Sequence, residues 1–424
     1  MKHNRRTKAL PRAPLLLLLP HLHIHLIHPR KMTTINKAAP NTPYYTPAQE
    51  PPAGTFLPTP GKPCPTLFKP LKIKNTTFNN RFWVSPMCQY SADDGHMTDY
   101  HLVHLGAIAM RGPGFTMIEA TAVTPEGRIT PQDVGLWKDE QIAGVKKVAD
   151  FVKSQGQVVG MQIAHAGRKG STLAPWLGTA VAPEGEGQGF AKDVIAPSAE
   201  AWDENHATPK EMSLDDIEKI KQAFVVTAKR AIKAGVQVIE IHGAHGYLLH
   251  EFVSPATNHR TDQYGGSFDN RIRLSLEICE AVKAAIPAET PLFYRVSATD
   301  WLEPGKGWDL DQSIELAKRL HSIGIDLLDV SSGGNHCAQQ INAHPGFQVP
   351  FATAIKKAVP GLLVGAVGLI VTSEMARDVV EKEEADVVFV AREFLRDPSF
   401  VLRCAHELGV EVKWPNQYHR AQFH

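Results

Sequence analysis

The sequence predicts an α/β protein whose parallel strands close into a barrel. Short runs rich in Val, Ile and Leu alternate with longer helical patterns along most of the 424 residues. The runs lack strict polar alternation, as expected for parallel strands buried on both faces. Eight strand–helix repeats favour a single-domain (β/α)₈ or TIM barrel over an open sheet. The expected strands cover residues 82–87, 115–120, 158–164, 238–242, 292–296, 327–331, 362–366 and 387–390.

Helical stretches separate these strands, with clear examples at residues 214–234, 271–285 and 310–323. Ser213 followed by Asp216 has the spacing of a capping box, which predicts where the first of these helices begins. After the third strand, residues 175–212 are long and rich in Gly and Pro. Long loops inside compact domains are usually functional, so we expect this insertion to form a lid at the barrel mouth.

The two ends of the chain differ from the repeating middle. Residues 1–66 are expected to form a disordered or extended N-terminal extension, and residues 67–424 the barrel with a C-terminal tail. Basic residues precede the run 15–19 of leucines, as in a signal peptide, but four histidines between His21 and His28 interrupt the apolar stretch. We therefore expect a cytoplasmic protein without a working secretion signal.

Composition excludes several classes of partner. The 45 basic and 44 acidic residues give a net charge of +1, so neither nucleic acid nor an anionic membrane is indicated. The five cysteines are scattered without a CxxC pair, which argues against a disulfide framework or a zinc ribbon and favours a reducing compartment. A small-molecule substrate is the expected partner.

The predicted strands end in polar or special residues, and barrel enzymes place their catalytic groups at the carboxyl ends of strands. The expected site therefore draws on several strands at once. Its candidates at or just after strand ends are Ser85, Pro86, Met87, Cys88, Ala120, Gln162, His165, His242, His245, Arg295, Gly365, Gly368, Ala391 and Arg392.

The segment from His242 to Tyr247 carries the most chemical information. Residues three apart in a strand point to opposite faces, so His242 and His245 converge only if the chain turns between them, which Gly243 and Gly246 permit. Two imidazoles side by side can donate hydrogen bonds to one carbonyl oxygen and polarise it. The alternative is a metal-dependent lyase or hydrolase using His165 with this pair, but no carboxylate or thiolate follows at ligand spacing.

Several motifs in the same order resemble the Old Yellow Enzyme family over the chain from about residue 67 to the C-terminus. The resemblance is carried by Ser85–Tyr90, Gln162–Arg168, Arg295–Ser297 and the run from His242 through His250, Asn258, Arg260 and Tyr264 to Arg271. Several independent motifs in one order are far more specific than a lone pattern.

The resemblance implies a bound FMN. Arg295 would stabilise negative charge at the pyrimidine edge of the reduced flavin, and Gln162 offers a donor and an acceptor to the same edge. Main-chain contacts and packing against the ring are expected from Ser85, Pro86, Met87 and Ala120. The phosphate is expected at Gly365, Gly368 and Arg392, where the family carries Gly in place of Ala391.

The resemblance also implies an ene-reductase, or NADPH dehydrogenase, with ping-pong kinetics. NADPH or NADH reduces the flavin and leaves, and an enone, enal, maleimide or nitroalkene then takes its place. His242 and His245 would hold the activating oxygen, Tyr247 would protonate the α-carbon, and Tyr90 would help to hold the substrate.

Two further residues assign the subgroup. Cys88 beside Met87 is similar to the cysteine-bearing, thermophilic-like members and would tune the flavin potential; the alternative is a non-catalytic flavin redox sensor. The ending Gln417-Tyr418-His419-Arg420 resembles a tail that reaches across a dimer, which implies a homodimer or higher homo-oligomer with Arg420 in the neighbouring substrate site. The alternative is a solvated terminal arginine.

Overall fold

A computed structural model describes residues 35–423, so the signal-like segment lies outside the described residues. The described residues from Lys37 onward form one compact unit. None of the helices within the described range combines the length and apolar character that a bilayer crossing requires.

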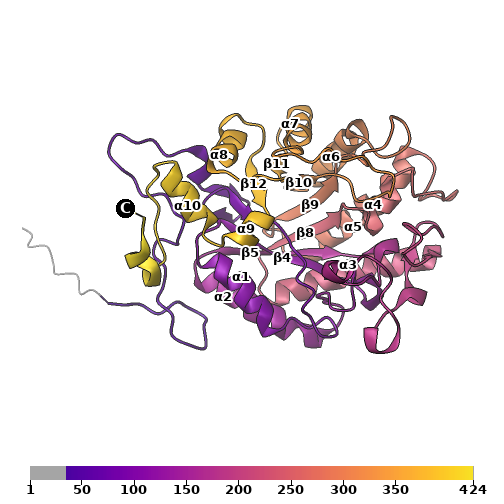
Figure 1. Ribbon diagram of the computed structural model, residues 1–424, viewed down its shortest axis with the longest axis horizontal. Coiled ribbons are helices and arrows are strands. Elements are labelled where there is room, and N and C mark those ends of the chain that lie inside the picture. The colour runs from indigo at the N-terminus through magenta and orange to yellow at the C-terminus, as the bar shows by residue number, and fades with distance from the viewer. Residues whose placement is uncertain (1–34, 424) are drawn as a thin grey trace, which may run out of the picture. The chain divides into compact units, whose positions relative to one another are not determined.

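Eight parallel strands form a closed barrel in which the last strand pairs with the first (Figure 1). This confirms the predicted (β/α)₈ barrel, and each strand begins at or within one residue of its expected start. The strands in barrel order are β3 (Phe82–Val84), β4 (Phe115–Ala122), β5 (Val158–Ala164), β8 (Val238–Gly243), β9 (Leu292–Ser297), β10 (Leu327–Ser331), β11 (Leu363–Ala366) and β12 (Val387–Val390).

Helices follow the strands and surround the barrel (Figure 1). The N-cap of α3 is Ser213, whose side chain accepts the Asp216 N–H while the Asp216 carboxylate accepts the Ser213 N–H, so the predicted capping box is confirmed. The helices are α1 (Asp99–Ala109), α2 (Ile142–Ser154), α3 (Leu214–Lys233), α4 (Leu248–Val253), α5 (Phe268–Ala285), α6 (Leu310–Ile323), α7 (Val349–Ala358), α8 (Ser373–Glu381), α9 (Arg392–Arg396) and α10 (Phe400–Glu407).

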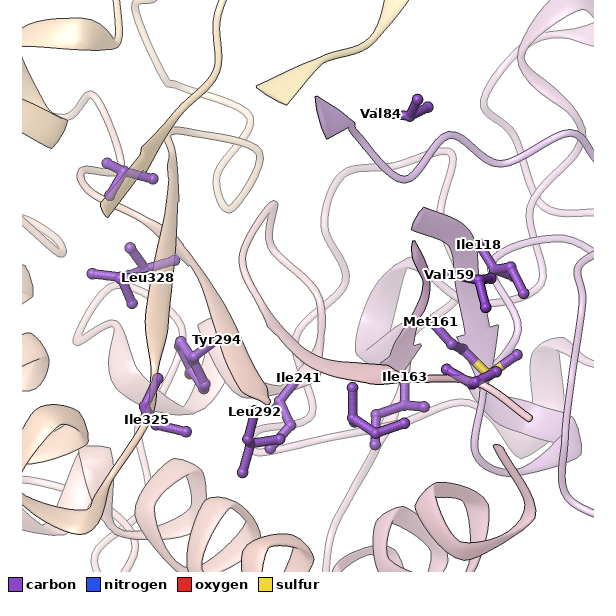
Figure 2. Packing of buried hydrophobic residues seen from close by; sticks show 14 of the residues in the cluster. Val84, Ile118, Val159, Met161, Ile163, Ile241, Leu292, Tyr294, Ile325 and Leu328 are labelled. Atoms are coloured by element: carbon purple, nitrogen blue, oxygen red, sulfur yellow. The ribbon is translucent and has the colours of Figure 1, made fainter. Parts of the chain in front are cut away.

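Two apolar layers hold the barrel together. The outer layer packs the strands against the helices; Figure 2 labels ten of its residues, Val84, Ile118, Val159, Met161, Ile163, Ile241, Leu292, Tyr294, Ile325 and Leu328. The inner layer is aromatic, and the Trp83 ring stacks on Phe293 with centroids 5.7 Å apart. A hairpin of β1 (Leu71–Ile73) and β2 (Thr76–Phe78) adds Ile73 and Phe78 to this layer. A packed barrel interior of this kind leaves the opposite, carboxyl end of the strands for ligands.

The insertion after β5 consists of 3₁₀ turns and two short paired strands. The turns are Pro175–Leu177, Gly185–Gly187 and Ala191–Asp193, and the strands are β6 (Ile195–Ala196) and β7 (Lys210–Glu211).

The described part of the N-terminal extension runs beside the C-terminal segment (Figure 1). Gly54 donates its N–H to the Lys413 carbonyl at 2.8 Å, and the Lys413 N–H donates to Thr55 at the same distance. The first and last parts of this compact unit therefore brace each other.

Candidate active site

Alternate residues of β8, β9 and β10 face the barrel interior and change from apolar to polar toward the carboxyl ends. In β9 the series is Phe293, Arg295, Ser297, with Phe293 in the inner aromatic layer. The ladder pairs His242 and Asp329 with Arg295 on neighbouring strands, which places their side chains on the same face. The barrel thus presents a polar interior only at its carboxyl end.

A buried charged layer lies directly above the aromatic one. The Arg295 guanidinium pairs with Asp329 at 3.1 Å and donates to Ser85 Oγ at 3.2 Å, while Gln162 donates to Glu240 Oε1 at 2.8 Å. Burial and the neighbouring Asp329 raise the pKa of Glu240, and Arg295 opposes that rise. Arg295 is therefore a fixed cation among buried carboxyl groups.

The loops after β11 and β12 line a cavity of about 200 Å³ that includes Gly368, Ala391 and Arg392. Within residues 35–423 the Arg392 guanidinium has no ion-pair partner, whereas Arg396 pairs with Glu393. Ala391 has a φ of −109°, so the methyl group that replaces the expected glycine is accommodated without a left-handed backbone. Gly365 does not line this cavity.

Gly365 lies inside β11, in register with Asp329 and Val387 of the neighbouring strands. A Cβ at this position would lie 2.5 Å from the Phe389 ring. The structure therefore separates Gly365 from the other expected phosphate-binding residues.

His242, His245 and Tyr247 come together in the turn after β8. The His242 ring lies 5.2 Å from that of His245 and 5.1 Å from that of Tyr247, measured between centroids. The left-handed positions are His245 (φ 61°) and Gly246 (φ 69°). Gly243 has another role, because a Cβ there would lie 2.0 Å from Tyr294 Oη. The expected turn exists, and only Gly246 of the two glycines makes it.

Buried side chains hold this turn from behind. The His245 N–H donates to Ser297 Oγ at 2.9 Å, and the Gly246 N–H donates to His250 Nδ1 at the same distance. His250 Nε2 in turn lies 2.9 Å from Asp300. The hydrogen bonds from the backbone N–H groups to these buried side chains fix the conformation of the turn.

Burial first, and then the positive charge of Arg295, lower the pKa of both His242 and His245 well below the usual value. Both rings are therefore neutral near pH 7. His242 Nδ1 accepts the Ala244 N–H at 3.3 Å, so its single proton lies on Nε2 and that atom is a donor. His245 Nε2 lies 2.7 Å from Ser331 Oγ.

Cys88 and Tyr90 lie in the loop after β3, which is held by a buried carboxyl group. Glu119 accepts the Gln89 N–H at 2.9 Å, and burial raises the pKa of Glu119 to about 8. The Tyr90 ring meets Trp176 of the insertion edge to face, 5.7 Å between centroids. The insertion therefore reaches the residue expected to hold the substrate.

His165 does not join the histidine pair. Its Nδ1 accepts the Gly167 N–H at 3.1 Å, and burial lowers its pKa to about 3. In the part of the chain that the structure describes, no three His, Cys, Asp or Glu side chains are arranged to hold a metal ion.

Arg420 lies away from the site of its own chain. It is exposed in the 3₁₀ turn Asn416–Ala421, where Tyr418 stacks under Arg111 at 5.1 Å. Arg111 follows α1 shortly before β4 begins, at the amino end of the barrel. The structure therefore does not bring Arg420 together with the other expected site residues of its own chain.

Comparison with known proteins decides the family. The model of the NADH:flavin oxidoreductase / NADH oxidase family matches residues 66–411. The chain belongs to this family. It is 50% identical over 394 residues to an NADH:flavin oxidoreductase of Gibberella zeae, covering 90% of this chain and 94% of that one. An NADPH dehydrogenase of Bacillus subtilis is 45% identical over 84% of this chain and 98% of its own.

Solved structures agree with this assignment. Morphinone reductase matches with a TM-score of 0.67 at 26% identity, over 83% of this chain and 92% of its own. A 2-naphthoyl-CoA reductase matches with a TM-score of 0.73 at 25% identity over 81% of this chain, which spans about half of that longer protein. The protein is thus a member of the Old Yellow Enzyme family, an oxidoreductase that uses FMN and a nicotinamide cofactor.

The residues of this flavin oxidoreductase fit FMN. Glu240 Oε2 is buried without a hydrogen-bond partner, and the buried Arg295 supplies positive charge beside it. The cavity at Gly368 and Arg392 supplies backbone and an unpaired guanidinium suited to a phosphate. These groups lie along the carboxyl end of one barrel, from β8 to β12.

Sequence reasoning missed Glu240 and Asp329. Both lie two residues from apolar inward positions, Val238 and Leu327, and Glu240 also lies two residues before His242. Because alternate residues of a strand face the same side, continuing the alternation along β8 and β10 predicts both as inward-facing polar groups. Ser297 continues the inward series of Phe293 and Arg295 in β9, so the same alternation marks it, whereas Asp300 had no such signal because it lies in a loop.

Proposed function

We propose that this protein is an ene-reductase that reduces the activated C=C bonds of enones, enals, maleimides or nitroalkenes. The observation that carries this proposal is the convergence of two neutral imidazoles and one phenol at the carboxyl end of the barrel. FMN, when bound, supplies the hydride chemistry by accepting a hydride from NAD(P)H and returning one to the substrate.

The two histidines bind and polarise the activating oxygen. His242 donates from Nε2. When Ser331 donates to His245 Nε2, the proton of that neutral ring lies on Nδ1, which becomes the second donor. Two donors aimed at one oxygen stabilise the enolate charge that develops as the β-carbon is reduced.

Tyr247 donates the proton to the α-carbon. Its ring packs against His242, which places the acid beside the group that holds the oxygen. Tyr90 forms another side of the substrate space, and Arg420 of a second subunit completes it in a homodimer. Because NAD(P)H and the alkene share this one space, we expect ping-pong kinetics.

The remaining residues bind the cofactor. Gln162 and Arg295 would bind the pyrimidine edge of FMN, and Gly368, Ala391 and Arg392 would hold its phosphate. Gly365 contributes through strand packing and not through a phosphate contact. Ring packing and main-chain contacts come from Ser85, Pro86, Met87, Cys88 and Ala120.

A direct test is an absorption spectrum of the purified protein followed by anaerobic stopped-flow kinetics. We expect bound flavin, reduction by NADPH, and reoxidation by cyclohexenone and N-ethylmaleimide, with parallel double-reciprocal lines in the steady state. A redox sensor would be reduced without turnover on any alkene. A metal-dependent enzyme would instead lose activity to a chelator, and either result would overturn the proposal.

A further inference from the structure

Lys169 joins three elements at the proposed active site. It ends the 3₁₀ turn Gly167–Lys169 that follows β5. Its Nζ donates to the His245 carbonyl at 2.9 Å and to the Gly334 carbonyl at 3.0 Å. These carbonyls belong to segments in close backbone contact, since a Cβ on Gly246 would lie 2.1 Å from the Gly334 oxygen. The ammonium group of Lys169 thus links the turn from His245 to Tyr247, here called the catalytic turn, to the loop after β10.

The same ammonium lies against two aromatic rings. Its Nζ is 4.9 Å from the centroid of the Tyr247 ring and 5.6 Å from that of Trp202, which belongs to the insertion after β5. A cation at this distance from a ring face is attracted to it, more strongly when water is excluded. The attraction is larger for an anionic phenolate than for a neutral phenol, because a full negative charge replaces a quadrupole.

Lys169 is largely cationic near neutral pH, although its pKa is lowered. Burial is the largest effect and lowers its pKa to about 8, opposed by Glu251 and reinforced by Arg168. Burial raises the pKa of Glu251 to about 8 as well. On the side of the catalytic turn, His242 and His245 are neutral near pH 7, so Lys169 supplies positive charge next to Tyr247.

We infer that Lys169 is a positioning residue that holds the turn from His245 to Tyr247 and stabilises the phenolate form of Tyr247. This inference rests on the proposed role of Tyr247 as the acid. In that step the phenol O–H bond breaks, a C–H bond forms at the α-carbon, and a phenolate remains until it takes a proton from solvent. The ammonium, through the ring face, lowers the free energy of that phenolate.

The variants that test this are Lys169→Met, which keeps an apolar stem without the charge, and Lys169→Arg, which keeps the charge. Lys192→Met is the matched control, because Lys192 is an exposed lysine of the insertion. In the holoenzyme we expect Lys169→Met to slow flavin reoxidation by cyclohexenone about tenfold, consistent with a buried cation–π contact. Lys169→Arg should retain more of the rate, and reduction by NADPH should change little in either variant.

Two further measurements separate this role from a general structural one. The reoxidation rate of the unmodified protein should fall as pH rises through about 8, where Lys169 loses its charge, and Lys169→Met should lack that limb. In a Tyr247→Phe background, Lys169→Met should add little further slowing. An equal tenfold effect in both backgrounds would overturn the inference.

A measurement without turnover keeps the inference independent of the enone assignment. With 3-fluorotyrosine placed at position 247, the ¹⁹F chemical shift of the holoenzyme reports the charge that lies beside the phenol ring. We expect this shift to titrate near pH 8, where Lys169 loses its charge, in the parent and in Lys192→Met, and this step to be absent in Lys169→Met. A parent without this step would overturn the role of Lys169 even if the protein reduces enones, whereas the step without enone turnover would overturn only the proposed reaction.

Discussion

Tyr247, the proposed acid, is a protonated phenol near neutral pH. Burial, and then the neighbouring Cys88 and Tyr90, raise its pKa well above the usual value, so it keeps its proton across the physiological range. We predict that Tyr247→Phe slows reoxidation by an enone by about 10²–10⁴-fold, the usual contribution of a general acid. Reduction by NADPH should be nearly intact, because that half-reaction needs no proton from Tyr247. Stopped-flow rates that are unchanged in both half-reactions would exclude Tyr247 as the acid.

Cys88 is expected to be a poor nucleophile. Burial, with the charges of Asp133 and Glu119, raises the pKa of its thiol well above the usual value, and the thiol is the unreactive form. We predict that iodoacetamide at pH 7.5 modifies the exposed Cys337 first and leaves Cys88 intact, as read by peptide mass spectrometry. Preferential labelling of Cys88 would favour the redox-sensor alternative.

At the residue scale, some members of the candidate site could be predicted from the sequence and others could not. His242, Arg295 and Gln162 were predictable because each ends a strand or lies near its end, where barrel enzymes place their chemistry. Glu119 lies at the end of the strand expected at residues 115–120, but its contribution could not be predicted, because it is a hydrogen bond from the N–H of Gln89 in a loop 30 positions earlier. Lys169 likewise acquires its role from the His245 and Gly334 carbonyls, which only the fold brings to it.

At the scale of elements, strand starts were predicted well and some strand ends were not. The first strand was expected to reach residue 87 but ends at Val84, shortly before Pro86, which lacks the N–H that a ladder requires. The hairpin of β1 and β2 was missed because three-residue strands give too little periodicity. Hydrophobic periodicity can be recognised only over longer segments, and β1 and β2 are short.

The C-terminal turn depends on one buried amide of the N-terminal extension. Gln49 accepts the Asn416 N–H at 3.0 Å and donates to Gln417 Oε1 at 2.9 Å. We predict that Gln49→Ala destabilises this contact by about 1–3 kcal/mol, because two hydrogen bonds are lost and each contributes about 0.5–1.5 kcal/mol net. Hydrogen exchange should accelerate at residues 416–421 and stay unchanged in the barrel strands.

Gln222→Ala is the control, because Gln222 is an exposed helical amide bonded to Glu218. If both variants leave the exchange of residues 416–421 unchanged, the extension does not hold the tail.

At the scale of the whole molecule, the proposed substrate site includes a residue of a second subunit. The tail that carries Arg420 is fixed at the amino end of its own barrel, opposite the catalytic turn. In a two-fold dimer each tail can reach the partner, and the two sites are then equivalent by symmetry. We therefore predict that Arg420 acts in trans, and that Arg420→Ala alone weakens alkene binding with little effect on bound flavin.

Mixing two defective proteins tests this arrangement. Arg420→Ala and Tyr247→Phe chains with different affinity tags are combined, and heterodimers are isolated by two successive purifications. If Arg420 acts in trans, one site of each heterodimer has both Tyr247 and the partner's Arg420, while the other lacks both. Enone reductase activity should then return toward half of the unmodified level. If Arg420 acted on its own subunit, each site would lack one group and no activity would return. A protein that sediments as a monomer at working concentrations would contradict the prediction before mixing, because no second tail would be present to complete the site.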